Sequence, residues 1–183
     1  TALERVKVAL TGRAGQRDLR PKARDEALRC KEAIEIFQRS ENALGLRGMA
    51  LKSAPDFEPM DIEGVTVSVR PDFIRDGAGE KIGAGIIRVA KAPNPEDCKR
   101  EATRVRKGDE RRELARYMTV LMHMLLEEQG QQYGAPSRNL SFVSDVRLGE
   151  TIMCPSDYMA RVRAIRAVCR QIASLESFLG VAL

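Results

Sequence analysis

Asp72 and Lys91 are the residues whose types and positions best suit chemistry on a charged group. Both fall in residues 62–91, the one long region dense in β-forming residues, and each lies toward the end of a predicted strand. An aspartate at a strand end commonly bonds nearby backbone amides, and a lysine there is commonly solvated. The alternative is that the two side chains share one face of a sheet and act as one site.

A second candidate is a stripe of arginines near the end of the chain. Arg163, Arg166 and Arg170 follow i, i+3, i+7 spacing, which places them on one side of a helix. No acidic residue occurs between Asp157 and Glu176 to neutralise them. The stripe predicts a surface that binds nucleic-acid phosphates, and the alternative is an ordinary solvated helix face.

Other common site chemistries are not present in the sequence. There is no Ser–His–Asp arrangement, no Walker loop and no dinucleotide-binding fingerprint. The glycine-rich residues 76–85 join strand to strand and are read as a hairpin turn. The cysteines lie far apart, and His123, the single histidine, is predicted to lie on the surface of its helix. The usual zinc spacings are therefore excluded, and reduced thiols are expected in place of a disulfide framework.

Composition bounds the class of protein. The chain has 183 residues, 43% of them hydrophobic, with a net charge of +5 and a pI near 9.2, so it fits a globular protein with a mildly basic surface. Aromatic residues make up only 4%, which supplies few stacking platforms for single-stranded bases. No apolar run approaches the roughly 18 residues that span a bilayer, so no membrane partner and a cytoplasmic location are expected.

The elements that must position these residues are read from periodicity and turn signals. Residues 1–21 form an N-terminal arm or short helix, and residues 22–183 form a single α/β domain. Strands and helices are expected in the order helix, strand, strand, helix, strand, strand, helix. The first long helix is expected over residues 22–44, with Gly45 and Gly48 as stops, and the last helix is expected to start at residues 155–157. Val65, Val67 and Val69 alternate with polar residues and are expected to form the first strand of the central hairpin. The helix that follows this hairpin is expected to break near Gly108. The predicted fold class is α/β (α+β), with a central mixed four-stranded sheet and helices packed on it.

This order, with Pro71-Asp72, Val89-Ala90-Lys91 and the helical run from Glu113 to Tyr117, resembles the RecB-like branch of the PD-(D/E)XK nuclease superfamily. The resemblance covers residues 25–146 and implies a restriction-endonuclease-like αβββαβ core. It implies that Asp72 and Lys91 are catalytic and that Asp72 is a ligand of Mg or Mn, which activates water for attack on a phosphodiester. Glu113 and Tyr117 then stand in the place of the Gln-x-x-x-Tyr motif of the following helix.

The departure from the family pattern decides the expected function. Val89 stands where the acidic-x-Lys triplet has its carboxylate, and one protein carboxylate holds a hard cation weakly. Carboxylates that could take its place are Glu26, Glu35, Glu63, Asp76, Glu80 and Asp145. We expect a nuclease-like nucleic-acid-binding domain with a degenerate metal site, weakly active or inactive as a metal-dependent phosphodiesterase. The alternative is a non-enzymatic accessory factor that binds a protein partner; the oligomeric state stays open.

Overall fold

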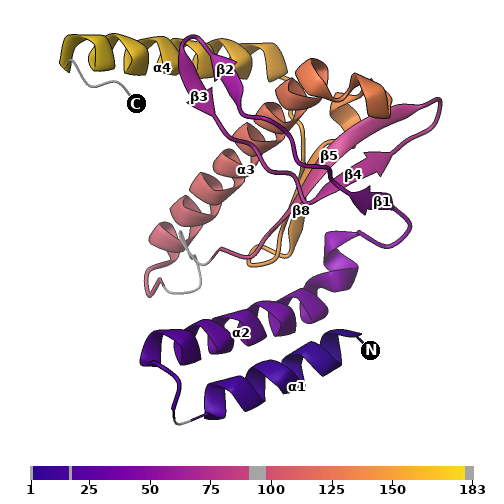
Figure 1. The fold of residues 1–183 in the computed structure, drawn as a ribbon, viewed down its shortest axis with the longest axis vertical. Coiled ribbons are helices and arrows are strands. Elements are labelled where there is room, and N and C mark those ends of the chain that lie inside the picture. The colour runs from indigo at the N-terminus through magenta and orange to yellow at the C-terminus, as the bar shows by residue number, and fades with distance from the viewer. Residues whose placement is uncertain (1, 17, 91–97, 180–183) are drawn as a thin grey trace.

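The computed structural model describes residues 2–16, 18–90 and 98–179 (Figure 1). Its helices are α1 (Ala2–Gly15), α2 (Pro21–Leu44), α3 (Glu101–Gln129) and α4 (Tyr158–Leu179), with short 3₁₀ turns η1 (Gln131–Tyr133) and η2 (Arg138–Leu140). Its strands are β1 (Ala50–Ser53), β2 (Met60–Ile62), β3 (Val65–Val67), β4 (Phe73–Asp76), β5 (Lys81–Arg88), β6 (Ala135–Pro136), β7 (Phe142–Asp145) and β8 (Glu150–Met153). Among these residues no helix is both long and apolar enough to cross a membrane.

The main sheet is mixed, as predicted, but the described residues give it six strands instead of the expected four. Its strand order is β1-β4-β5-β7-β8, with the short β6 also paired to β5. All neighbours along this path are antiparallel except β5 and β7, which run parallel and are joined through α3. Parallel neighbours need such a crossover connection, and a helix is its usual form. The α+β class is therefore confirmed.

The two faces of β5 are clearly distinguished. Ile82, Ala84 and Ile86 belong to the core that packs against the buried side of α3. Gly83 and Gly85 point to the other face, where the chain of η2 and the ring of Phe142 approach closely. A Cβ at Gly85 would lie 2.3 Å from that ring, so this position requires glycine. Strand alternation then assigns every later position of β5 to one face or the other.

The predicted central hairpin is only half right. Residues 77–80 do make its turn, since Gly77 N–H donates to the carbonyl of Lys81, and β5 follows it. The strand before the turn is β4, however, and the valine-rich β3 pairs with β2 in a separate two-stranded hairpin. Glu63 and Gly64, both at positive φ, form the tight turn of that hairpin. The prediction missed this Glu-Gly turn and merged β3 with the main sheet.

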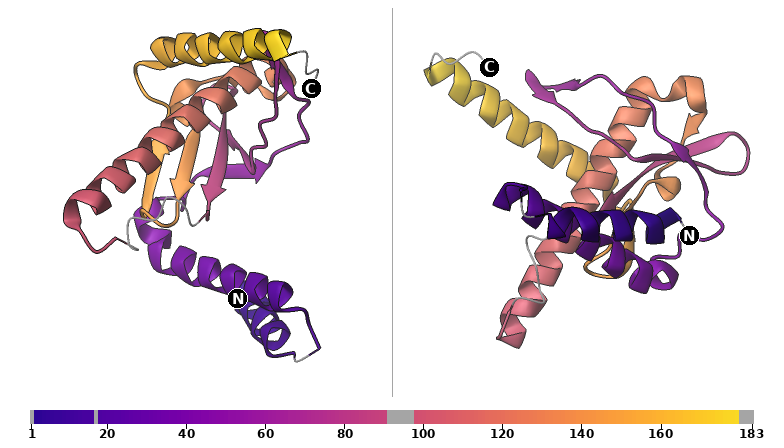
Figure 2. Two further views of the ribbon diagram at one scale, coloured as in Figure 1. Left: turned by 90° about the vertical axis from the view of Figure 1, so that its left-hand side faces the viewer. Right: turned by 60° about the horizontal axis from the view of Figure 1, so that its bottom comes forward.

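The helix after the central hairpin departs from expectation. α3 runs unbroken through Gly108, so the predicted break there is wrong. A glycine inside a helix costs only about 1 kcal/mol relative to alanine, and the flanking helix-forming residues outweigh that cost. α2 ends as predicted at Gly45, whose φ of 61° is the left-handed conformation typical of a helix C-cap. α1 packs along α2, and this helical hairpin projects from the rest of the chain (Figure 2).

Candidate functional site

Asp72 lies in a bend immediately before β4 and is solvent-exposed. Its Oδ2 accepts a hydrogen bond of 2.8 Å from the backbone N–H of Ile87, and its own N–H donates to the carbonyl of Gly85 at 2.9 Å. The carboxylate thus pairs an amide of β5 that lies beyond the end of β4. This is the role expected of an aspartate at a strand end. Lys91, the proposed partner, lies outside the described residues.

Val89 follows the last residue of β5 and has 46% of its surface exposed. Alternation along the strand gives it the side of Gly83 and Gly85, away from α3. Ile86 and Arg88 lie on the opposite face of the sheet, which α3 covers. No carboxylate occupies positions 86 to 89 on either face.

The ends of β5 and β7 carry a buried ion cluster under α3. Arg111 and Asp145 are both 0% exposed, and Arg111 Nε lies 2.6 Å from Asp145 Oδ2. Arg88 Nη1 lies 3.7 Å from the same carboxylate oxygen and donates to the carbonyl of Arg111 at 3.2 Å. Asp145 Oδ1 accepts from the backbone N–H groups of Arg147 and Leu148, both at 3.1 Å. Sequence reasoning did not identify this cluster, because Arg111 and Asp145 are far apart in the chain.

The cluster fixes its charges in place. Arg111 Nη2 also donates to the carbonyl of Ala90 at 2.7 Å, which ties the end of β5 to α3. Burial, followed by the nearby guanidinium of Arg111, lowers the pKa of Arg88, while Asp145 acts in the opposite direction. A buried charge needs such partners, because an unpaired one costs several kcal/mol. Asp145 is therefore committed to arginines and backbone amides and does not offer a free oxygen to a metal ion.

Three of the other carboxylates considered as metal ligands have cationic partners, whereas Glu26 and Glu80 form no ion pair with a described residue. Asp76 pairs with Lys52 at 2.6 Å, Glu63 with Arg170 at 3.2 Å and Glu35 with Lys31 at 3.8 Å. Within residues 2–16, 18–90 and 98–179, no group of three or more histidine, cysteine, aspartate or glutamate side chains is arranged to hold a metal.

Glu113 and Tyr117 both meet α4 through Arg161. Arg161 donates to Glu113 Oε1 at 2.5 Å, and its guanidinium carbon lies 4.8 Å from the ring centroid of Tyr117. The hydrogen bond from Arg161 is the main cause that lowers the pKa of Glu113, and Arg116 adds to it. The two residues expected on the motif helix therefore join α3 to α4. Arg111 of this helix, rather than Glu113 or Tyr117, reaches the ends of β5 and β7.

The three arginines of α4 do not form a uniform basic surface. Arg163 is exposed, whereas Arg170 pairs with Glu63 of the β2–β3 turn. Arg166 lines a groove together with four carboxylates. These neighbours come from β2–β3 and from the far end of α3, so no local pattern around the arginines indicates them.

A more concentrated basic surface lies where α1 meets α2, and we call its residues the hairpin tip. It carries four exposed cations against the single carboxylate of Asp18: Arg13, Arg20, Lys22 and Arg24. Within the described residues, the ion pairs of this helical hairpin involve Lys7, Lys31, Glu32 and Glu41 and none of the tip cations. The arginine-rich connector was visible in the sequence, but its projection from the rest of the chain was not.

His123 is buried, so its predicted surface position is wrong. Only 3% of the residue is exposed, and its ring packs edge-on against Tyr158 with centroids 5.1 Å apart. Its Nε2 lies 3.3 Å from Glu127, which also accepts a 2.6 Å hydrogen bond from the Tyr158 hydroxyl. Burial, then the bond to Glu127, raises the pKa of Tyr158. The packing of α4 against this side of α3 covers a face that the helix pattern alone marked as polar.

Comparisons with protein-family models, with curated proteins and with solved structures find no match to this chain.

Proposed function

We propose that this chain is a nuclease-like domain that binds nucleic acid and does not cleave it. The order of its elements supports the scaffold: α2, β1, β4, β5, α3 and β7 follow the αβββαβ sequence that the PD-(D/E)XK resemblance implies. The strands of this set are neighbours in the same order in the sheet, with β5 and β7 parallel.

The loss of cleavage rests on the strand ends. Counting back by two from the buried Ile74 gives Asp72 the α3 side of the sheet, where β5 presents Ile86 and Arg88. If the acidic-x-Lys triplet lies on that side, Ile86 thus takes its acidic position and Arg88 takes its lysine position. An isoleucine supplies no oxygen ligand, and Arg88 adds positive charge where a cation would bind. Whichever of positions 86 and 89 is taken for the missing carboxylate, the residue there is apolar.

The single observation that carries the binding proposal is the charge of the hairpin tip. Its cations Arg13, Arg20, Lys22 and Arg24 are exposed and free of ion pairs with described residues, whereas most basic residues of α3 and α4 pair with nearby carboxylates. Exposed unpaired cations on a projecting element attract the phosphates of a duplex without reading its sequence. The arginine stripe of α4 stays a prediction, with Arg163 as its most available member.

The test is a salt titration of binding to a short DNA duplex, followed by fluorescence anisotropy. If all four tip cations contact phosphates, the slope of log K against log salt is about −3 to −4, and Kd falls in the range of about 10⁻⁴ to 10⁻⁶ M. Arg13→Gln, Arg20→Gln and Lys22→Gln together should weaken binding at least about tenfold at low salt. No strand scission above background is expected with Mg²⁺ or Mn²⁺.

The matched control removes the same number of charges from α4, with Arg163→Ala, Arg166→Ala and Arg170→Ala in one protein. It should weaken binding less than the tip variant does, because two of its arginines lie beside carboxylates. Equal binding by the wild type and the tip variant would overturn the proposed interface. Metal-dependent cleavage that disappears with Asp72→Ala would overturn the proposal of an inactive site.

A further inference from the structure

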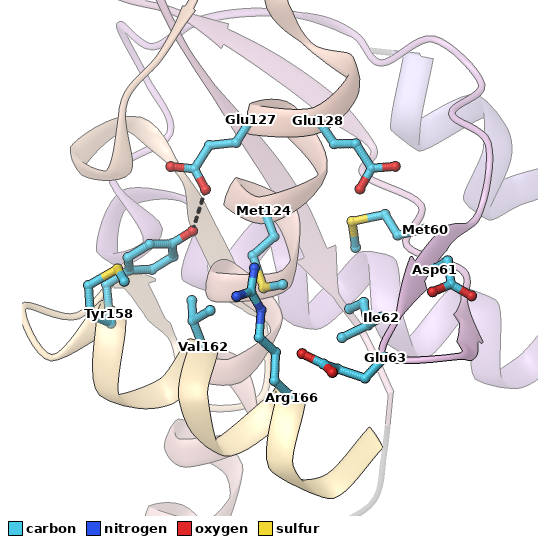
Figure 3. A pocket seen from close by; sticks show the side chains of 11 residues that line it. Met60, Asp61, Ile62, Glu63, Met124, Glu127, Glu128, Tyr158, Val162 and Arg166 are labelled. Atoms are coloured by element: carbon cyan, nitrogen blue, oxygen red, sulfur yellow. Dashed lines mark hydrogen bonds between the residues drawn. The ribbon is translucent and has the colours of Figure 1, made fainter. Parts of the chain in front are cut away.

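An open groove lies between the β2–β3 hairpin, the C-terminal part of α3 and the first part of α4 (Figure 3). Its volume is about 700 Å³. Apolar side chains from all three elements line its middle: Met60, Ile62, Met124, Met159 and Val162. Methionine is flexible and polarizable, so such a lining adapts to the shape of an inserted side chain.

Carboxylates surround this apolar lining. Glu127 and Glu128 come from α3, and Asp61 and Glu63 come from the β2–β3 hairpin on the other side of the groove, as Figure 3 shows. Arg166 is the one basic residue in the lining. Among the described residues, Glu63 pairs with Arg170 and Glu127 accepts a hydrogen bond from Tyr158, whereas Asp61 and Glu128 form no ion pair. The groove is therefore acidic around an apolar centre.

The hairpin tip has the complementary pattern. Its four exposed cations flank Leu19 in the sequence, and Leu19 is a partly buried leucine in the connection between α1 and α2. The tip and the groove lie at opposite ends of the molecule in Figure 1, with the α1–α2 connection at the bottom and β2, β3 and α4 at the top. One copy therefore cannot place its own tip in its own groove, but the tip of a second copy can reach it.

We propose that the groove is a docking site for the hairpin tip of a second copy of this chain. Leu19 enters the methionine-lined centre, and Arg13, Arg20, Lys22 and Arg24 face the carboxylates around it. Two different surfaces meet in such a contact, so it joins copies head to tail and does not close at two. Charge complementarity of this kind sets register and association rate, and it weakens as salt screens the charges.

This contact goes beyond the proposed nucleic-acid binding, although both use the hairpin tip. A duplex and the groove of a neighbouring copy present negative charge to the same cations, so they should compete. The two proposals remain separable, because only self-association needs the groove. If the wild type self-associates but does not bind a duplex, only the nucleic-acid proposal fails. If the wild type binds a duplex but does not self-associate, only the docking proposal fails.

The experiment is sedimentation velocity on the full chain over a range of concentrations. In about 50 mM salt the weight-average sedimentation coefficient should rise with concentration, and in about 500 mM salt it should stay at the monomer value. A groove variant (Glu63→Lys with Glu128→Lys) and a tip variant (Arg13→Gln, Arg20→Gln and Lys22→Gln) should each remain monomeric alone. Circular dichroism checks that both variants fold.

Mixing the two variants gives the decisive result. The groove variant keeps an intact tip and the tip variant keeps an intact groove, so together they should form a dimer with one copy of each and nothing larger. A control with Glu101→Lys and Glu110→Lys, two exposed residues of α3 outside the groove, should associate like the wild type. A wild type that stays monomeric at low salt, a mixture that stays monomeric, or a control as impaired as the groove variant would overturn the proposal.

Discussion

Asp145 and Glu128 show two opposite uses of a carboxylate in this protein. Asp145 is fully buried at the end of β7, between two arginines and two backbone amides. Glu128 is exposed in the groove and forms no ion pair with a described residue. A buried charge must be satisfied inside the fold, so it is committed to structure, whereas an exposed one remains available to a partner. Residue type alone does not distinguish these uses, but burial does.

The largest expected effect tests the buried side of this comparison. Asp145→Asn keeps the shape of the side chain but removes the charge that faces Arg111 and Arg88. Leaving buried guanidinium groups without their carboxylate costs about 3–5 kcal/mol. We expect the free energy of unfolding, measured by urea titration, to fall by that amount without a change in slope.

The matched control is Glu128→Gln, which removes one carboxylate from the groove. Exposed substitutions of this kind change stability by about 0.5 kcal/mol or less. A loss below about 1 kcal/mol for Asp145→Asn would mean that the buried cluster contributes no more than a surface ion pair. The distinction between committed and available carboxylates would then fail.

Features set by local residues were predicted better than features set by contacts between distant segments. Turn and cap residues gave good helix ends: α2 ends at Gly45, and the final helix begins just after Asp157. Strand pairing was predicted less well, because the alternation of Val65 and Val67 shows that a strand exists but not which strand it joins. The parts of the chain that depend on local chemistry were therefore the more predictable ones.

The candidate site depended on contacts that no local pattern reveals. Arg111 meets Asp145 only because α3 crosses the sheet between β5 and β7. Arg170 meets Glu63 only because the β2–β3 hairpin lies beside α4. Both pairs join residues distant in the sequence, so their charges looked free when read along the chain. The exposure of Asp72 at a strand end was foreseeable, and so was its bond to a neighbouring amide.

A smaller effect concerns His123, which is buried next to the groove. Burial is the main cause that lowers its pKa from 6.5, while the contact with Glu127 acts in the opposite direction. Below its ordinary pKa the unfolded chain binds a proton that the folded chain resists, so stability falls as pH falls. Between about pH 7.5 and 5.5 we expect a loss of about 1 kcal/mol, within the 1.4 kcal/mol per unit that one group can supply.

The measurement is urea unfolding at several pH values for the wild type and for His123→Leu. The variant should lose stability less steeply over this range, because leucine binds no proton. The difference between the two curves removes the contribution of other titrating groups. Identical pH dependence in the two proteins would show that the buried ring is protonated as readily as an exposed one.

The smallest effect lies between the two extremes, at the half-exposed pair of Arg112 and Glu150. Arg112 donates to both carboxylate oxygens, at 2.9 and 2.7 Å, but the Glu150 side chain is 43% exposed. The hydrogen bond from Arg112 is the main cause that lowers the pKa of Glu150 from 4.5. A carboxyl group with a lowered pKa stabilises the fold above its ordinary pKa, and that contribution is lost as pH falls through the folded value. Solvent screening limits the stabilisation from this pair to about 0.5 kcal/mol.

We therefore expect Glu150→Gln to lower the free energy of unfolding by about 0.5 kcal/mol near pH 7, and this loss should shrink as pH falls through the lowered pKa of Glu150 and its side chain becomes neutral. Glu101→Gln is the control, because Glu101 pairs with Arg104 at 3.3 Å while its side chain is 73% exposed, and no measurable change is expected there. If Glu150→Gln costs as much as Asp145→Asn, partial burial already commits a carboxylate to the fold. If Glu150→Gln costs nothing, even a bidentate pair at this exposure remains free to exchange its partner, and only full burial separates the structural carboxylates from the available ones.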